Sequence, residues 1–482
     1  MRVFSFLSVA CALALLSACA VGPDFTPPAP PEAGSYDSES LSAVTADGAQ
    51  EVKEGKQIES KWWAAFHSAS LNALVDRALQ RNPDLETMQA RLRGAEAARA
   101  AEEAALFPTV SGGFSSQRQK TSGASNGGLF RGFTYTLHDA SVGVSWGLDL
   151  FGGTRRAVEG LDAQVNQTRF EEQTARLALI ANVVTTAVQE AALQERLKET
   201  ESLIADQTQI LKIVTARFDA GSVPKGAVTS QQSAVAAAVA TLPPLKKQES
   251  ATRHALAALT GDMPNARMGA TLRLDDLTLP STLPLTLPSQ LVGQRPDIRA
   301  AQEDLHAASA AIGVAVAQRL PQITLSADVG SMANRLANLF GPGGGFWNLG
   351  ANASEVLFDS GALANKEEEA RAAYDASAAQ YKKTVLAAFQ NVADSLHALH
   401  ADAESLNAAQ EAEQAAAETL TLTEVQQKAG AISEDSVLAA RAAHSQVAQD
   451  LTQAKAQRLA DTAALFAALG GGLNADDGKD SQ

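Results

Sequence analysis

The sequence has few cysteines, few aromatic residues and no excess of positive charge. Its 482 residues include two cysteines, Cys11 and Cys19, which belong to no paired pattern, so a disulfide framework is excluded. Aromatic residues make up 5% of the chain, and with the abundance of alanine this predicts long helices in close contact rather than bulky globular cores. The net charge of −15 argues against a nucleic-acid partner, which requires a basic face.

The sequence also lacks a constellation of residues that would perform catalysis. No Gly-x-Ser-x-Gly elbow is present, and the glycine runs at 341–345 and 470–472 are not phosphate loops, because no Lys-Ser/Thr follows them. Among the histidines, only His397 and His400 share a helix face, with Glu404 one turn on. These three residues could bind a metal weakly, but a solvated helix face is the better interpretation. We predict no enzyme activity, no cofactor and no metal site.

What the chain does contain is a long internal repeat. Pro83 and Pro296, each followed by aspartate, open alanine-rich helical runs, and Pro108 and Pro321 close those runs 25 residues later. Proline suits the first turn of a helix but cannot continue one, and the segments that follow alternate like strands. This helix–stop–strand unit occurs twice at an offset of 213 residues, which predicts two similar halves. We expect no ligand at these prolines.

The N-terminus has the features of a secretory signal. In residues 1–18, Arg2 precedes an apolar stretch that is too short to span a bilayer comfortably. Leu16-Ser17-Ala18-Cys19 resembles a bacterial lipobox, in which Cys19 becomes the first residue and is lipidated; an ordinary cleavage site beside a chance cysteine is the alternative. Residues 19–60 are predicted to form an extended, lipidated tether, because most of this region is rich in proline, serine and glycine.

Four segments have the pattern of strands that could cross a membrane. From Val142 to Leu150, apolar residues alternate with serine, glycine and aspartate. The predicted strands lie at about 108–118, 136–150, 321–332 and 346–358. Each is near the length of a tilted outer membrane strand, roughly 9–11 residues, and a soluble half-buried sheet is the alternative. We predict no other strands. Since four cannot close a barrel, membrane insertion would require further copies of the chain.

Two long helical hairpins are predicted after these strands, over 153–261 and 361–470. The outward helix of the first continues for about 65 residues, or about 100 Å, which no compact globule requires. Gly221 and Gly430 are the expected C-caps of the outward helices. Pro243-Pro244 is expected to interrupt or kink the first return helix.

The folded part of the chain begins with an aromatic cluster. Trp62, Trp63 and Phe66 precede an apolar helix, so we predict buried packing anchors rather than an aromatic binding site. The predicted organisation is a signal peptide (1–18), a lipidated tether (19–60), a first structural repeat (61–265), a crossing strap (266–290), a second structural repeat (291–472) and a disordered tail (473–482).

Several motifs together resemble the outer membrane factor (TolC-type) family, in its NodT-like lipoprotein branch. They are Cys19-x-x-Gly22-Pro23-Asp24-Phe25, Trp62-Trp63, Asp149-Leu150-Phe151-Gly152, Arg217-Phe218-x-x-Gly221 and, after the proline-rich strap, Gln294-Arg295-Pro296-Asp297-Ile298. The resemblance covers about residues 19–472. It implies an α+β membrane protein, a homotrimer in which four strands per chain form one 12-stranded outer membrane β-barrel. The barrel would continue into a long periplasmic α-helical coiled-coil barrel.

The resemblance also implies a function and a location. Such proteins passively conduct drugs or other small molecules outward, coupled to a periplasmic adaptor and an inner membrane RND-type transporter. The chain would be lipid-anchored in the Gram-negative outer membrane, in contact with its lipid. The exit duct of a type I protein secretion system is the second interpretation, which the lipobox disfavours. A periplasmic adaptor would lack strands of membrane length, and a lipid-anchored enzyme would need a catalytic constellation.

The resemblance places the working residues at the periplasmic tips of the two hairpins, where family members narrow the tunnel and meet the adaptor. The candidate gate and adaptor-contact residues are Asp219, Gly221, Ser222, Gly430, Glu434 and Asp435. Family members often carry acidic residues just after the second tip glycine, but the matching positions here include Ser436 and Ala439. Glu434 and Asp435 could replace them as pore-facing carboxylates, or could be ordinary charges at a helix N-terminus.

Overall fold

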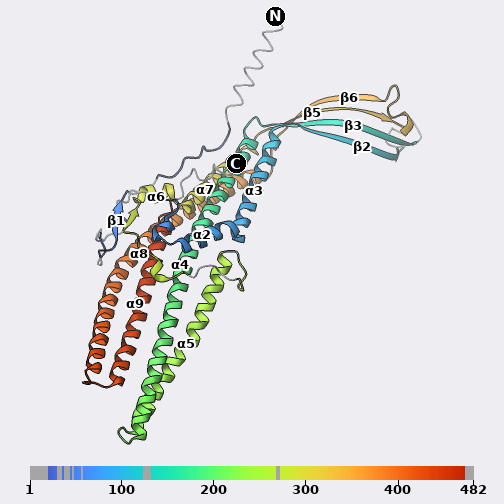
Figure 1. The fold of residues 1–482 in the computed structure, drawn as a ribbon. Coiled ribbons are helices and arrows are strands. Elements are labelled where there is room, and N and C mark those ends of the chain that lie inside the picture. Colours follow the sequence, from blue (N-terminus) through green and yellow to red (C-terminus); the bar gives the residue numbers. More distant parts are fainter. Residues whose placement is uncertain are drawn as a thin grey trace. The chain divides into compact units, whose positions relative to one another are not determined.

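The chain forms two compact units (Figure 1). The computed structural model describes residues 20–29, 35–36, 44–45, 48–55, 58–122, 132–266 and 272–472. The predicted signal peptide, Cys19 and the tail after residue 472 lie outside the described residues. Unit 1 comprises the chain up to Pro28, Arg91–Arg169 and Ala300–Lys382, and unit 2 comprises Ala29–Ala90, Phe170–Arg299 and Lys383 onward.

Unit 1 is built around an antiparallel sheet with the strand order β2-β3-β5-β6 (Figure 1). The strands are β2 (Thr109–Lys120), β3 (Thr134–Leu148), β5 (Gln322–Ala333) and β6 (Gly345–Ser354). Each half of the sequence supplies one pair of neighbours, and β3 and β5 join the two pairs. Within the described residues, β2 and β6 therefore pair along one side only and form the two edges of the sheet.

The two faces of this sheet have opposite chemistry. Two adjacent rows across the four strands are Gly112, Val142, Val329 and Trp347 on one face, and Ser111, Gly143, Asp328 and Asn348 on the other. On the first face Val329 is 60% exposed and Trp347 is 74% exposed. The basic residues of these four strands, Arg118 and Lys120, lie on the first face at the C-terminal end of β2, away from these two rows. The first face suits hydrocarbon and the second suits water.

The helices that enter and leave the sheet begin at defined residues. α3 (Pro83–Glu103) and α7 (Pro296–Ala317) start at the two Pro-Asp units, and the 3₁₀ turn η2 (Ala104–Leu106) joins α3 to β2. α4 (Gly153–Asp219) follows β3, and α8 (Ala362–Lys428) follows β6. A second short 3₁₀ turn, η5 (Leu336–Asn338), follows β5.

An aspartate caps the start of each long helix. The Asp149 carboxylate accepts hydrogen bonds from the backbone N–H groups of Thr154 and Arg155, both at 3.0 Å. Asp359 accepts from Gly361 at 2.8 Å and from Leu363 at 2.7 Å. The backbone N–H of Leu363, followed by that of Gly361, lowers the pKa of the Asp359 carboxyl. The Asp149-Leu150-Phe151-Gly152 motif is thus a helix-initiation signal.

Unit 2 is mainly helical. Its elements include η1 (Trp62–Phe66), α2 (Ala69–Arg81), α5 (Lys225–Leu259), η4 (Leu274–Asp276), α6 (Pro288–Gln294) and α9 (Glu434–Ala468), with most of α4 and α8. Trp62 stacks on Phe466, with 5.3 Å between ring centroids. Trp62, Trp63 and Phe66 are 2%, 3% and 0% exposed, so the prediction that they are packing anchors is confirmed. One described helix, α4, has a window apolar enough to cross a membrane, but 56% of that window is buried in the fold.

The internal repeat is visible in the lengths of the elements. α4 and α8 each contain 67 residues, α5 and α9 each contain 35, and β2 and β5 each contain 12. α4 lies beside α5, and α8 lies beside α9, as two long hairpins (Figure 1). Equal lengths mean that the two hairpins can occupy equivalent places in a ring.

One sequence-based expectation was wrong. The four long strands are not the only strands, because β1 (Glu51–Glu54) pairs in parallel with β4 (Thr282–Leu285) in the strap. The Gln50 side chain also donates to Pro280 O at 3.1 Å. This end of the predicted tether is therefore paired with the strap rather than free. The signal was missed because both strands are short and their partners lie far apart in sequence.

The prolines of α5 do not interrupt it. The helix is continuous from Lys225 to Leu259, with Pro243 and Pro244 inside. Both prolines are exposed, so the carbonyls that lose an N–H partner can be hydrated. Buried Ala238 and Leu245 on either side of the prolines hold the helix in place. Tertiary packing outweighs local propensity here.

The chemistry of the two sheet faces predicts a one-residue contrast in β3. Val142→Arg places a charge on the apolar face, at a cost of about 2–4 kcal/mol if that face meets the middle of a bilayer. The fraction of protein recovered in membranes in a protease-resistant form should fall sharply. Ser141→Arg, on the opposite face, is the matched control and should insert normally. Equal recovery of the two variants would contradict the assignment of the faces.

Candidate functional site

The first hairpin tip, in unit 2, is closed by glycine in a left-handed conformation. Gly221 has φ of +74°, which glycine adopts without the penalty that a Cβ brings. Its N–H donates to Phe218 O at 2.8 Å, and Ser222 N donates to Arg217 O at 2.8 Å. The Ser222 hydroxyl donates to the same carbonyl, and Lys225 Nζ lies 5.3 Å from the Phe218 ring centroid. These contacts form a Schellman cap with a second turn-closing bond.

The second tip repeats this geometry. Gly430 also has φ of +74°, its N–H donates to Gln427 O, and Ala431 N donates to Gln426 O, both at 2.9 Å. A Cβ at Gly221 or Gly430 would meet nothing within 4 Å. The backbone conformation, and not a lack of space, therefore requires glycine at both predicted C-caps.

One ion pair joins the two hairpins near their tips. Arg217, in the last turn of α4, donates to Asp435, in the first turn of α9, through Nη1 at 2.9 Å and Nη2 at 2.8 Å. The two side chains are 38% and 27% exposed. Burial works to raise the pKa of Asp435, but hydrogen bonds from Ser433 and Arg217 and the Arg217 charge outweigh it and lower the pKa. This bidentate pair is the strongest polar feature of the tips.

The other candidate residues lie outside this pair. Asp219 and Glu434 are exposed, and the described residues supply neither carboxylate with a polar partner. Ser436 and Ala439 are also exposed. The structure thus separates the two acidic candidates of α9, because Asp435 bonds to Arg217 and Glu434 faces solvent. In the sequence Arg217 stands out only as part of a motif, because its partner lies 218 residues away.

The contact between α4 and α9 carries further polar pairs above the tips. Arg441 in α9 lies 3.7 Å from Asp206 in α4 and donates to Glu424 in α8 at 3.0 Å. Burial raises the pKa of Asp206, and Arg441 opposes the shift. Thr452 donates to Glu199 at 3.2 Å. We call this line of contacts, from Arg217–Asp435 to Thr452–Glu199, the α4–α9 seam.

A groove runs beside the seam between α4, α5 and α9. It has a volume of about 970 Å³ and reaches Asp435. Its walls are largely small or aliphatic side chains, including Leu203, Ile210, Ala234, Ala238, Ala439 and Ala443. Such a surface can accept the apolar face of another helix.

A second titratable group lies between α8 and α9, away from the tips. Burial raises the pKa of Asp402 to about 7, a hydrogen bond and the charge of Asp461 add to the shift, and Arg458 opposes it. Arg458 is fully buried, so the nearby carboxylates balance its charge. Within the described part of the chain, no cluster of three or more His, Cys, Asp and Glu side chains could hold a metal ion. His400 Nδ1 lies 2.9 Å from Leu396 O.

Comparison with known proteins gives this geometry a context. The sequence model of the family described as outer membrane efflux protein matches residues 74–262 and 287–471. The pyoverdine export outer membrane protein OpmQ of Pseudomonas putida is 31% identical over 454 residues, which cover 93% of this chain and 95% of that protein. The probable efflux pump outer membrane protein TtgC of Pseudomonas putida is 28% identical over 480 residues, or 99% of this chain and 98% of that protein.

The fold is also similar to that of solved channels. The structure of the outer-membrane channel OprN aligns with a TM-score of 0.83 at 28% sequence identity, over 94% of this chain and 99% of that one. These matches span both halves of the repeat and both hairpin tips.

The Arg217–Asp435 pair predicts a pH-dependent stabilisation of the seam. Because the pKa of Asp435 is lowered in the folded state, the stabilisation is present above its unfolded pKa and is lost as pH falls through the folded value. A double-mutant cycle with Arg217→Ala and Asp435→Ala should give a coupling of about 0.5–1 kcal/mol at pH 7. Urea unfolding followed by circular dichroism measures it. Glu434→Ala is the control, and an equal coupling of Glu434 to Arg217 would contradict the assignment.

Proposed function

This chain belongs to the outer membrane efflux protein family, and we therefore propose that three copies assemble into the outer membrane duct of a tripartite efflux system. The duct would conduct small organic molecules passively, since the relatives include proteins named for pyoverdine export and for an efflux pump. Those names support small-molecule efflux over protein secretion.

The observation that carries this proposal is the two-faced sheet with open edges. An apolar face meets lipid and a polar face lines a watery passage, but unpaired edge strands cannot remain in hydrocarbon. β2 and β6 run in opposite directions, so β6 of one copy can pair with β2 of the next in an antiparallel barrel. Three copies would supply 12 strands, within the range of natural outer membrane barrels.

The helical hairpins supply the periplasmic part of the duct and its contact with partners. As a passive conduit, the duct would take its energy from an inner membrane RND-type transporter. A periplasmic adaptor would dock a helical hairpin at the tips, and the groove beside Asp435 supports this because its small residues allow close helix packing.

The tips supply the gate. Arg217–Asp435 ties α4 to α9 within one copy, whereas Gln426 and Gly226 stand at the equivalent positions of α8 and α5. Tips held by one ion pair per copy would close the passage, and movement of α4 away from α9 would open it. Asp219, Gly221, Ser222, Gly430 and Glu434 would shape the exposed tip that the adaptor meets.

The chain would be anchored in the outer membrane by lipid as well as by the barrel. Cys19 lies directly before the first described residue, Ala20, and follows small residues as in a lipobox. The lipid would hold the chain at the membrane before the barrel closes.

The gate predicts a change in conductance. Asp435→Asn and Arg217→Gln should each raise the open-state occupancy of the purified channel by about tenfold or more, because three ion pairs are lost from each trimer. Conductance in planar lipid bilayers measures this. Glu434→Gln removes a neighbouring charge that bonds to nothing in the described residues and should leave the conductance near wild type. Unchanged conductance in both Asp435→Asn and Arg217→Gln would contradict the assignment of the gate to the Arg217–Asp435 ion pair.

The barrel predicts an intermolecular contact between edge strands. Ser115→Cys in β2, combined with a cysteine scan of Gly345–Ser354 in β6, should produce disulfide-linked ladders that end at the trimer on non-reducing gels. Lipidated Cys19 leaves no competing thiol in the mature chain. The single-cysteine variants are the controls. A ladder that stopped at the dimer or continued past the trimer would contradict the proposed stoichiometry.

A further inference from the structure

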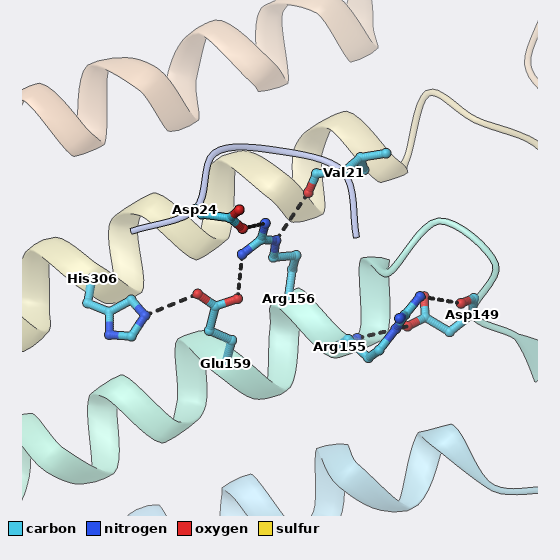
Figure 2. A network of polar contacts seen from close by, with 7 residues as sticks. All are labelled: Val21, Asp24, Asp149, Arg155, Arg156, Glu159 and His306. Carbon is cyan, nitrogen blue, oxygen red and sulfur yellow. Dashed lines mark hydrogen bonds and ion pairs between the residues drawn. The ribbon is translucent and has the colours of Figure 1, made fainter. Parts of the chain in front are cut away.

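The first described residues of the chain lie against the helices of unit 1. Both backbone polar groups of Val21 are hydrogen-bonded. Its N–H donates to Phe151 O at 3.0 Å. Its carbonyl accepts from Arg156 Nε at 3.1 Å, as Figure 2 shows. Phe151 belongs to the segment between β3 and α4, and Arg156 lies in the first turn of α4. These contacts hold the segment Ala20–Phe25 at the point where a strand becomes a long helix.

Arg156 is the central side chain of this contact. Besides Val21 O, its guanidinium donates to Asp24 Oδ1 at 2.6 Å and to Glu159 Oε2 at 2.7 Å (Figure 2). Arg156 is only 5% exposed, whereas Asp24 is 94% exposed. A guanidinium so deeply buried is costly unless its N–H groups are satisfied, and the N-terminal segment supplies two of its three acceptors. Losing the segment would remove two of the three acceptors and leave Glu159 as the remaining protein partner of Arg156.

Close backbone approach makes the contact selective for glycine. Gly22 has φ of +96°, and a Cβ there would lie 2.4 Å from Gly313 Cα. A Cβ on Gly313 in α7 would lie 2.8 Å from Arg156 Cγ and 2.9 Å from Val21 O. A Cβ on Gly152 would lie 2.6 Å from Ala20 Cα. Gly22 on the segment, and Gly152 and Gly313 on the surface it contacts, therefore allow a backbone approach that a side chain at any of these positions would prevent.

An aromatic stack completes the contact. The rings of Phe25 and His306 are nearly parallel, at 11°, with 4.4 Å between centroids. His306 Nε2 lies 3.1 Å from Glu159 Oε1 (Figure 2). Glu159 thus links the residue that holds Asp24 to the residue that holds Phe25. Five of the six positions in Ala20–Phe25 make a hydrogen bond, an ion pair, a ring stack or a close glycine contact, and the exception is Pro23.

We propose that Gly152, Arg156, Glu159, His306 and Gly313 form a binding site for the chain's own N-terminal peptide, Ala20–Phe25. Its second role is positional. Ala20 is held against Gly152, four residues beyond the end of β3, so the described chain starts at the base of the sheet. A lipid on Cys19 would then enter the membrane beside the strands instead of at the end of a free tether. This second role rests on the proposed lipidation and barrel, whereas the peptide site itself does not.

Hydrogen–deuterium exchange of the full-length channel in lipid tests the peptide site. The N-terminal amides, above all that of Val21, should exchange about tenfold or more slowly than in an unstructured peptide. Gly313→Ala should abolish that protection. Gly94→Ala is the matched control, because Gly94 is a helical glycine in unit 1 with nothing within 4 Å of an added Cβ, and it should keep the protection. No protection in the wild type, or equal protection in both variants, would overturn the site.

Asp24→Ala is a second test variant, which is needed in case Gly313→Ala fails to fold. Asp24 is exposed and contributes nothing to the core, so its replacement should leave the fold intact. It should reduce the protection of Val21 several-fold while the circular dichroism spectrum stays unchanged, and unaltered exchange would count against the role of Arg156.

The positional role is measured separately, as the fraction of lipidated chain recovered as heat-resistant trimer. Gly313→Ala should lower this fraction several-fold and Gly94→Ala should not. If Gly313→Ala lost the protection of the Val21 amide but formed trimers normally, the positional role alone would be overturned. A wild-type chain that formed no trimer would instead contradict the proposed function and leave the exchange result standing.

Discussion

Unpaired backbone at the edges of a sheet is the constraint on which the rest of this structure depends. The four strands of unit 1 expose apolar side chains such as Trp347 on one face and polar ones such as Asn348 on the other. Such a sheet is useful only at a boundary between lipid and water, yet lipid does not tolerate the free N–H and C=O groups of β2 and β6. A single chain cannot satisfy both conditions. Closure by further copies satisfies them, and the duplicated hairpins provide each copy with two nearly equal parts of a helical ring.

The duplication also shows where the two halves must differ. The carbonyls of Arg217 and Gln426 accept equivalent Schellman bonds. Of these two side chains, that of Arg217 is charged and pairs with Asp435, whereas that of Gln426 is neutral. Asp435 is the second residue of α9, and Gly226 is the second residue of α5. A contact between α8 and α5 of neighbouring copies would have no such ion pair at this level. Both repeats keep the local backbone requirement, a glycine with φ of +74° at the tip. The Arg217–Asp435 ion pair has no counterpart at the equivalent positions, Gln426 and Gly226.

Patterns that act over a few residues were readable from the sequence. Pro83 and Pro296 start helices because proline fits the first turn, and strict alternation identified β3. The long-range contacts were not readable. Arg217 and Asp435 are separated by 218 residues, and Asp24 and Arg156 by 132, so their pairing depends on how helices and loops pack. Pro243 and Pro244 do not interrupt α5, because local helix propensity is overridden by the packing of a 35-residue helix.

The modest strength of the seam suits the proposed gate, which a partner would open. An ion pair as exposed as Arg217–Asp435 contributes about 0.2–1 kcal/mol, so three pairs in a trimer contribute up to about 3 kcal/mol. In the proposed gate, that upper value would favour the closed tip by about a hundredfold. Inverting a 1:99 population requires about 5.5 kcal/mol of differential binding, which a helix docked in the groove beside Asp435 in each of three copies can supply. A much stronger seam would exceed what docking can reverse, and a weaker one would leave the outer membrane leaky when no pump is attached.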